Sequence, residues 1–336
     1  MDLARPPLLR AAILKLSAGS QEVVLLASHH FATDPISWGI LVENLEAIYE
    51  ALESQRPVRL PLKGTSYKEW AEKLSTYANS DSALHEASYW QQVPWDKCTP
   101  LRVDHDTETQ QPGRCASICL EMSETRALMS DAGRVHGVHI NEILVAALAN
   151  ALASCVEQHT LCINLFHHGR VNGFEGAGHM NVSRTVGWFS AAIPLLLEVQ
   201  PGAAMKTTLR TVEHRLRTLP NEGVGYSVLR HLREGWKESA VAPPSDVLLN
   251  HQGVLSGGDT NRLFATQFDT DGYAESLIQL NLPWKLAVLS NIAADRLNAH
   301  FVSRVYRQTT LERIADDFLH NLRELIGMSR CVAASG

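Results

Sequence analysis

The sequence predicts an α/β protein whose helices pack on mixed β-sheets, and three observations support this fold class. Apolar, β-rich runs alternate along the chain with stretches whose apolar residues recur at helical spacing. No internal repeat or low-complexity tract appears, which argues against a repeat architecture. The chain has 336 residues, of which 45% are hydrophobic, and this suits two domains with a sizeable core.

The charge balance excludes two classes of partner. With 30 Lys and Arg against 36 Asp and Glu, the net charge is −6, and no basic cluster of the kind that binds nucleic acid or an anionic membrane appears. The longest apolar stretches, 143–149 and 186–197, are shorter than the roughly 18–20 residues that a membrane span needs. We therefore expect no nucleic acid and no membrane as partners.

Cysteine usage indicates the compartment. Six cysteines in 336 residues are sparse and form no CxxC pair, so free thiols in a reducing cytoplasm are expected rather than a disulfide-held scaffold. The apolar run at 8–16 is interrupted by Arg10 and Lys15, which is untypical of a signal-peptide core. We expect a cytoplasmic protein.

The first elements read as a hairpin followed by helices. Two β-rich runs at 8–16 and 22–29 flank turn-forming residues at 17–21. Asp34 and Pro35 then predict a helix start, with Asp34 as N-cap and proline at the first helical position. A further helix is expected at 66–77.

A polar stretch at 93–113 contains several prolines, which favours a connection between two lobes. We place the N-terminal lobe at 1–104 and the C-terminal lobe at 105–336. In the second lobe we expect strands at 115–122, 161–166, 246–250, 286–292 and 297–302 and helices at 123–135, 140–155, 203–219 and 310–326. The helix at 140–155 is apolar almost all round and is therefore expected to be buried. Thr309 and Glu312 predict a capping box at the last helix.

The sharpest local signal for chemistry is the stretch from His29 to Asp34. An imidazole at a strand end, near a carboxylate, can act as a general base close to neutral pH. The alternative is structural: the histidines satisfy hydrogen bonds at the strand end and Asp34 caps the helix. A third interpretation, a metal site, draws on several imidazoles, but these lack the spacing of a zinc-binding helix; the residues concerned are His29, His30, His167, His168 and His179.

Several segments together resemble the condensation and epimerization domains of nonribosomal peptide synthetases. His29 to Asp34 is similar to the HHxxxDG motif, and residues 184–189 read RTVGWF, as in the epimerization branch, of which Trp38 after Ser37 is also typical. Weaker matches support the assignment over nearly the whole chain: Asp2-Leu3 with residues 7–10, Tyr89-Trp90, residues 141–146, Pro220 to Tyr226, and residues 249–253.

This resemblance implies a fold and a mode of action typical of secondary metabolism. The fold is that of chloramphenicol acetyltransferase, with two α/β lobes and a channel between them. The substrate is an aminoacyl or peptidyl thioester on the phosphopantetheine arm of a carrier protein, so the domain needs no cofactor of its own. The reaction is amide-bond formation or Cα epimerization.

The resemblance also implies residue roles. His30 is the base, His29 orients it, and Asp34 is structural, held by an arginine that the sequence does not identify. Burial of Asp34 requires such a counter-charge on physical grounds as well. The residues expected to line the channel are Ser37, Trp38, Phe166, His167, His168, Arg170, Arg184, Gly187, Trp188, Tyr226 and Asn250.

Three departures from the family pattern bear on activity. Phe166 stands where epimerization domains have a glutamate, and a phenyl ring cannot exchange a proton; His167 or His168 would have to replace it. Pro35 stands where the family has glycine and has no backbone N–H to offer, although it also opens a helix well. Only 28 residues precede His29, so we expect an incomplete first lobe: either a separate chain supplies the missing segment, or the sequence is a truncated fragment. Other synthetase domains are further expected partners.

Two alternative functions are open, and the three departures favour the first of them. One is a catalytically silent module that docks carrier proteins. The other is a standalone acyltransferase that uses acyl-CoA, although the DFGWG motif of the plant-type branch is absent from the sequence.

Overall fold

The structure, a computed structural model, describes residues 2–15, 22–98, 100–104, 113–132, 137–155, 159–174, 178–236, 243, 246–255, 276–279 and 282–333. The expected hairpin turn at 17–21 lies outside these ranges. So do residues 105–112 of the connection that we expect at 93–113. No helix of the described chain is long and apolar enough to cross a membrane.

The chain forms two compact units, and each of them is made of segments that are not consecutive in the sequence. The smaller unit combines Met1–Tyr77 with His168–Ser190, and the larger contains the described residues of Ala78–His167 and most of those beyond Ser190. The RTVGWF segment at 184–189 therefore lies in the same unit as His29 and His30. A domain boundary at residue 104 stays a prediction.

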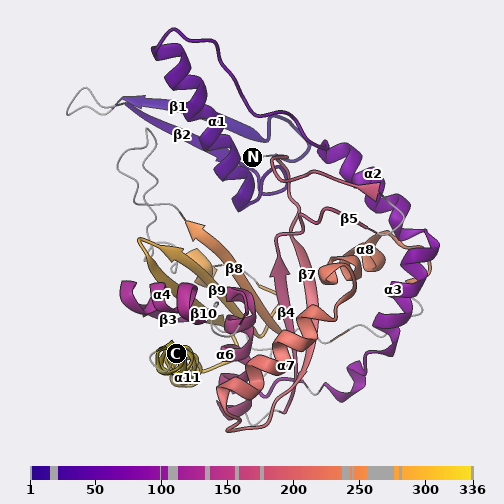
Figure 1. Cartoon of the computed structure of the whole chain (residues 1–336), viewed down its shortest axis with the longest axis vertical. Coiled ribbons are helices and arrows are strands. Elements are labelled where there is room, and N and C mark those ends of the chain that lie inside the picture. Colours follow the sequence, from indigo (N-terminus) through magenta and orange to yellow (C-terminus); the bar gives the residue numbers. More distant parts are fainter. Residues whose placement is uncertain are drawn as a thin grey trace. The chain divides into compact units, whose positions relative to one another are not determined.

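The smaller unit begins with the expected hairpin of β1 (Leu9–Lys15) and β2 (Glu22–Ser28), shown in indigo in Figure 1. The strands pair antiparallel, with Leu9 opposite Ser28 and Lys15 opposite Glu22. Helices α1 (Pro35–Glu53) and α2 (Tyr67–Ala78) follow, and α2 confirms the helix expected at 66–77. A short antiparallel pair, β5 (Gly173–Phe174) and β6 (Gly178–His179), belongs to the returning segment of the chain.

The larger unit is built on a six-stranded sheet in the order β3-β10-β9-β8-β4-β7. The strands are β3 (Arg114–Leu120), β4 (Thr160–His167), β7 (Ala191–Glu198), β8 (Val247–Leu255), β9 (Leu286–Ala293) and β10 (Arg296–Ser303). Strand β8 pairs parallel with β4 and β9, and the other pairings are antiparallel. The sheet is therefore mixed, as expected. Pro194 lies on the edge strand β7, where the missing N–H of a proline is tolerated.

Helices cover this sheet. Helix α6 (Ile140–Cys155) has the bounds that the sequence predicts, and most of it is buried between β4 and the helices α7 (Met205–Arg217) and α11 (Gln308–Ala333). Figure 1 shows α6, α7 and α11 together beside the sheet. Remaining elements of this unit are α3 (Asp81–Gln92), η1 (Trp95–Lys97), α4 (Met122–Ala127), η2 (Leu128–Ala132), η3 (Pro220–Gly223) and α8 (Val224–Leu232).

Two local expectations were wrong. Helix α11 begins at Gln308, so Thr309 lies inside the helix and forms no capping box; Gln308 Nε2 instead donates to Glu312 Oε1 at 2.9 Å. The single helix expected at 123–135 is the short α4 followed by the π-helical η2. Gly225 lies in α8, and a Cβ there would lie 2.1 Å from the carboxylate oxygens of Glu86.

Candidate active site

The loop after β2 ends in a capped helix. Asp34 is the N-cap of α1 and accepts a hydrogen bond from the Ser37 N–H at 2.7 Å, while Pro35 occupies the first turn. The proline therefore fits the helix start that the sequence predicts. Asp34 and Ser37 are both buried, so the Asp34 carboxylate requires a counter-charge.

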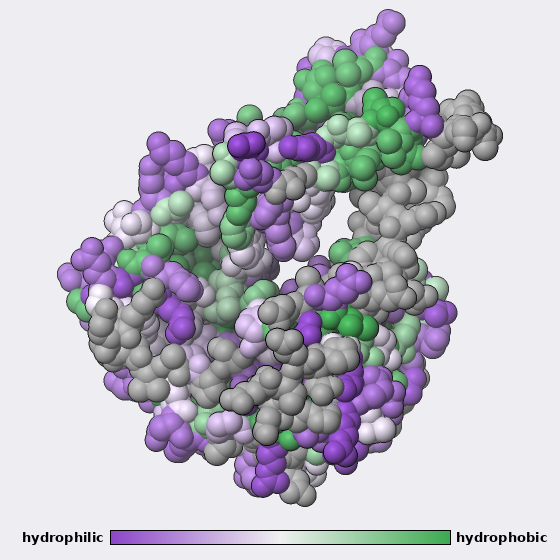
Figure 2. All heavy atoms as spheres, turned by 180° about the vertical axis from the view of Figure 1, so that it is seen from behind, coloured by the Kyte–Doolittle hydropathy of each residue, from purple (hydrophilic) through white to green (hydrophobic). Residues whose placement is uncertain are grey.

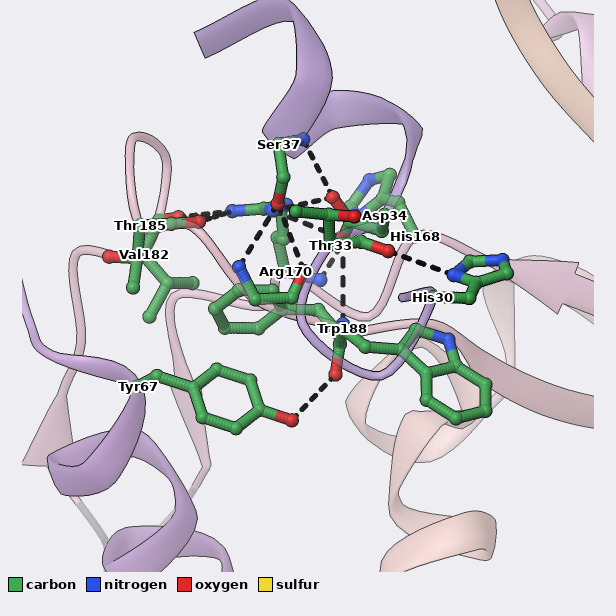
Figure 3. Close-up of polar contacts among 12 residues, drawn as sticks. His30, Thr33, Asp34, Ser37, Tyr67, His168, Arg170, Val182, Thr185 and Trp188 are labelled. Atoms are coloured by element: carbon green, nitrogen blue, oxygen red, sulfur yellow. Dashed lines mark hydrogen bonds and ion pairs between the residues drawn. The ribbon is translucent and has the colours of Figure 1, made fainter. Parts of the chain in front are cut away.

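That counter-charge is Arg170, which follows β4. Its Nη2 lies 2.9 Å from Asp34 Oδ1 and 3.0 Å from Oδ2, and the two side chains are only 5% and 3% exposed. Its Nη1 donates to the Val182 and Thr185 carbonyls at 2.7 Å each, as Figure 3 shows. The guanidinium also lies 4.1 Å from the Phe189 ring centroid. These contacts engage both terminal nitrogens of the guanidinium and so offset part of the desolvation of the two charges, whereas the buried Nε has no hydrogen-bond partner among the described residues.

Gly187 connects the RTVGWF segment to the start of α1. Its N–H donates to Ser37 Oγ at 3.0 Å, and its carbonyl accepts from Ser37 Oγ at 2.9 Å and from the Asp34 N–H at 3.1 Å. A Cβ at Gly187 would lie 2.2 Å from the Tyr67 ring, whose hydroxyl donates to the Trp188 carbonyl at 2.9 Å. Only glycine allows this approach.

His30 is oriented by the loop itself. Its Nδ1 lies 2.8 Å from the Thr33 carbonyl oxygen, and because a carbonyl only accepts, Nδ1 carries the proton. The lone pair of the neutral ring is therefore on Nε2, the atom that can act as a base. The side chain is exposed, and its ring lies 5.3 Å from the Trp188 ring, as Figure 3 shows.

His29 contacts a different part of the loop. Its Nδ1 accepts from the Phe31 N–H at 3.1 Å, and the two rings are 5.1 Å apart. The contact that orients His30 comes from Thr33, so orientation of His30 by His29 stays a prediction.

Other expected channel residues of the smaller unit have structural contacts. Arg184 pairs with Glu43 at 2.8 Å and hydrogen-bonds Asn44 at 2.9 Å, both on α1. His168 Nδ1 accepts from the Arg170 N–H at 3.0 Å. Trp38 lies in the first turn of α1, where its N–H donates to the Asp34 carbonyl.

The remaining expected residues belong to the larger unit. Phe166 packs against an apolar cluster that contains Leu248 and Leu289, and its ring meets Trp284 edge-on at 5.9 Å. Asn250 lies opposite it on β8. His167 Nε2 is 3.7 Å from Glu222 Oε2. Tyr226 is buried against Trp90, at a ring distance of 5.0 Å.

The sequence did not identify the partners of two site residues, Asp34 and His30. The need to neutralise Asp34 indicated an arginine, but nothing in the sequence selects Arg170 across 136 positions. The Thr33 carbonyl carries no sequence signal, because every residue has one. Among the described residues, no group of three or more His, Cys, Asp or Glu side chains is placed to hold a metal ion.

Comparison with known proteins identifies the family. The condensation-domain model matches residues 1–330. The chain is 30% identical over 333 residues to surfactin synthase subunit 2 of Bacillus subtilis (strain 168), covering 97% of this chain and 9% of that protein. It is 30% identical over 335 residues to bacitracin synthase 2 of Bacillus licheniformis, covering 97% of this chain and 12% of that protein. The chain thus spans a small part of these relatives.

A solved structure adds the architecture. The epimerization domain from the third module of tyrocidine synthetase B is similar with a TM-score of 0.82 and 26% identity, over 98% of this chain and 74% of that one. Together with the mixed sheet, this confirms the predicted chloramphenicol-acetyltransferase-like fold class. The chain belongs to the condensation-domain family of nonribosomal peptide synthetases.

Proposed function

We propose that this domain acts on an aminoacyl or peptidyl thioester carried by the phosphopantetheine arm of a carrier protein, with His30 Nε2 as general base. The observation that carries the proposal is the 2.8 Å contact between His30 Nδ1 and the Thr33 carbonyl, on a ring that is exposed. It fixes the tautomer in which Nε2 accepts a proton. The arm arrives with the partner, in the cytoplasm, and the domain contributes no cofactor.

Cα epimerization is the first candidate reaction. His30 Nε2 takes the Cα proton, and the electron pair of that C–H bond moves into the thioester as an enolate. A solvent water then delivers a proton to the opposite face of Cα, and the protonated His30 returns its proton to the resulting hydroxide. Likeness to the tyrocidine epimerization domain, at 26% identity, and the RTVGWF segment support this candidate.

Amide-bond formation is the second candidate, and Phe166 favours it. Its ring packs in an apolar cluster beside Trp284, so this position supplies no acid or base for the second face of Cα. Attack of an amine on a thioester requires positioning and one base that takes the amine proton as the thiol leaves.

A single assay separates these candidates. The chain is incubated in D₂O with a carrier protein loaded with an L-aminoacyl group, and deuterium at Cα is followed by mass spectrometry. Deuterium uptake that is lost in His30→Ala supports epimerization. Peptide formation with a second loaded carrier, again lost in His30→Ala, supports amide-bond formation. His85→Ala, which removes an exposed histidine from α3, is the matched control and retains activity.

The other outcomes identify the alternatives. Binding of the carrier without either reaction supports a silent docking module. Acyl transfer from acyl-CoA without a carrier supports a standalone acyltransferase. Activity that survives in a folded His30→Ala variant contradicts the role of His30 as the base.

A further inference from the structure

Two cysteine thiols meet at one end of the large sheet. Cys98 directly follows η1, and Cys162 lies in β4. The Cys98 thiol lies 3.9 Å from the Thr160 carbonyl oxygen of the same strand. Its side chain also hydrogen-bonds the Cys162 side chain. The two sulfurs are therefore neighbours although they lie far apart in sequence.

Their surroundings differ in a way that assigns each a role. Cys162 is 4% exposed, whereas Cys98 is half-buried. The hydrogen bond from Cys162 lowers the pKa of the Cys98 thiol, and this same bond, together with burial, raises the pKa of Cys162. Burial raises the pKa values of the thiols of Cys115, Cys119 and Cys155, the last to about 12. Among the five cysteines whose side chains the structure describes, Cys98 is thus the thiol best prepared to react as a thiolate.

We propose that Cys98 and Cys162 form a peroxide-sensitive dithiol in which Cys98 attacks and Cys162 resolves. The Cys98 thiolate attacks one oxygen of hydrogen peroxide, the O–O bond breaks, and Cys98 sulfenic acid and hydroxide form. The Cys162 sulfur then attacks the Cys98 sulfur, its proton joins the departing hydroxyl as water, and a disulfide remains. In sum, two thiols are oxidised and one peroxide is reduced to two waters.

The disulfide would fix the position of the segment that follows η1, residues 100–104, which is here called the strap. The chain at the end of η1 and after it runs past the ends of several strands: Lys97, the last residue of η1, pairs with Glu198 at 3.5 Å, and the Leu101 N–H donates to Asp246 Oδ2 at 2.8 Å. Further along, the Asp104 N–H donates to the Val305 carbonyl at 3.1 Å. A covalent bond from Cys98 to β4 would hold this strap at its start, so its amides should exchange more slowly with solvent in the oxidised protein.

The test treats the reduced full chain with hydrogen peroxide, blocks the remaining thiols with iodoacetamide, and maps the peptides by mass spectrometry. Trypsin leaves Cys155 and Cys162 in one peptide, so fragmentation assigns the linked sulfur. We expect a Cys98–Cys162 link that forms at least about tenfold faster than oxidation at Cys119, because a lower thiol pKa raises the thiolate fraction.

Two variants make the roles separable. In Cys162→Ser, whose hydroxyl keeps a hydrogen-bond donor beside Cys98 but cannot form a disulfide, the Cys98 sulfenic acid accumulates and is trapped by dimedone. In the matched control Cys119→Ala the link forms as in the unmodified chain. Full alkylation of Cys98 and Cys162 after peroxide, a link from Cys98 to another cysteine, or no dimedone adduct in a folded Cys162→Ser protein would overturn the proposal.

Discussion

At the residue scale, the stability of the smaller unit depends on one buried charge pair. Arg170 and Asp34 are almost fully buried, and the arginine also holds two backbone carbonyls. Removal of one partner of such a pair leaves an uncompensated charge away from water, which is far more costly than loss of a surface pair. The pair therefore fixes the loop that carries His30.

Replacement of Arg170 tests this directly. Arg170→Met should lower the free energy of unfolding by about 3–5 kcal/mol, measured by urea unfolding monitored by tryptophan fluorescence. Arg184→Met is the control, because its pair with Glu43 is 30% and 58% exposed and should contribute at most about 1 kcal/mol. Equal losses in the two variants would contradict the importance of burial.

Gly187 gives a second prediction at this scale. In Gly187→Ala the new methyl group would meet the Tyr67 ring, and the strain should cost about 1–3 kcal/mol. Gly39→Ala adds the same methyl group in α1 with no atom within 4 Å, and should stabilise the helix by up to about 1 kcal/mol. Thermal unfolding of both variants measures the difference, and destabilisation of similar size at both positions would count against the close contact.

At the element scale, the pairing of β8 with β9 contains a histidine that resists protonation. His251 Nδ1 lies 3.0 Å from Ser290 Oγ on the neighbouring strand, and burial lowers the pKa of His251 to about 4. In the unfolded chain the pKa is about 6.5. Between these values the unfolded state binds more protons, so the contribution of His251 is complete above about pH 6.5 and is lost as the pH falls towards 4.

Urea unfolding at pH 7 and pH 4.5 measures this loss. The unmodified chain should lose up to about 3 kcal/mol more between the two pH values than His251→Asn does. His85→Asn, which changes an exposed histidine, should keep the pH dependence of the unmodified chain. An unchanged pH dependence in His251→Asn would contradict a neutral, buried imidazole.

How far the sequence predicts these elements depends on what determines each one. Helix α6 is predicted to the residue because apolar side chains cover all its faces. Helix α8 was missed because three successive residues before it, Asn221, Glu222 and Gly223, have positive φ angles, and this turn resembles a loop in sequence. Helix α11 begins earlier than expected because Asp104, distant in sequence, accepts from the Arg307 N–H at its start.

The same distinction applies to the candidate site: its residues could be predicted from sequence motifs, but the contacts between them could not. The HHxxxD and RTVGWF segments indicated His30, Asp34 and Gly187, because their residue types carry the chemistry. The contacts between these segments are tertiary, and no local pattern specifies them. For example, Ser37 Oγ meets Gly187 across 150 positions.

At the scale of the whole molecule, the smaller unit leaves apolar surface open. Six side chains of the hairpin are more than 40% exposed: Leu9, Ile13, Leu14, Val23, Val24 and Leu25. They occupy both faces of the two strands, because neighbouring residues point to opposite sides. Figure 2 shows green patches in the region of the hairpin. Such surface promotes association between molecules.

A charge on the hairpin should reduce this association. Ile13 is 66% exposed, so Ile13→Lys should change the free energy of unfolding by less than about 0.5 kcal/mol while it lowers self-association in sedimentation velocity. Gln55→Lys adds the same charge at an exposed polar position and should leave self-association nearly unchanged. A large loss of stability in Ile13→Lys would show that this side chain is covered.

In the part of the chain that the structure describes, the smaller unit is assembled from two pieces, Met1–Tyr77 and His168–Ser190, with about ninety residues of the larger unit between them. During synthesis the first piece leaves the ribosome without Arg170 and Gly187, and so without the partners of Asp34 and Ser37. The loop that carries His30 can therefore reach its final geometry only after Ser190 has been translated. Until then the hairpin and α1 belong to an incompletely folded nascent chain, to which chaperones bind. Mutations in these elements should therefore lower the yield of folded protein more than they lower the catalytic activity of the molecules that do fold.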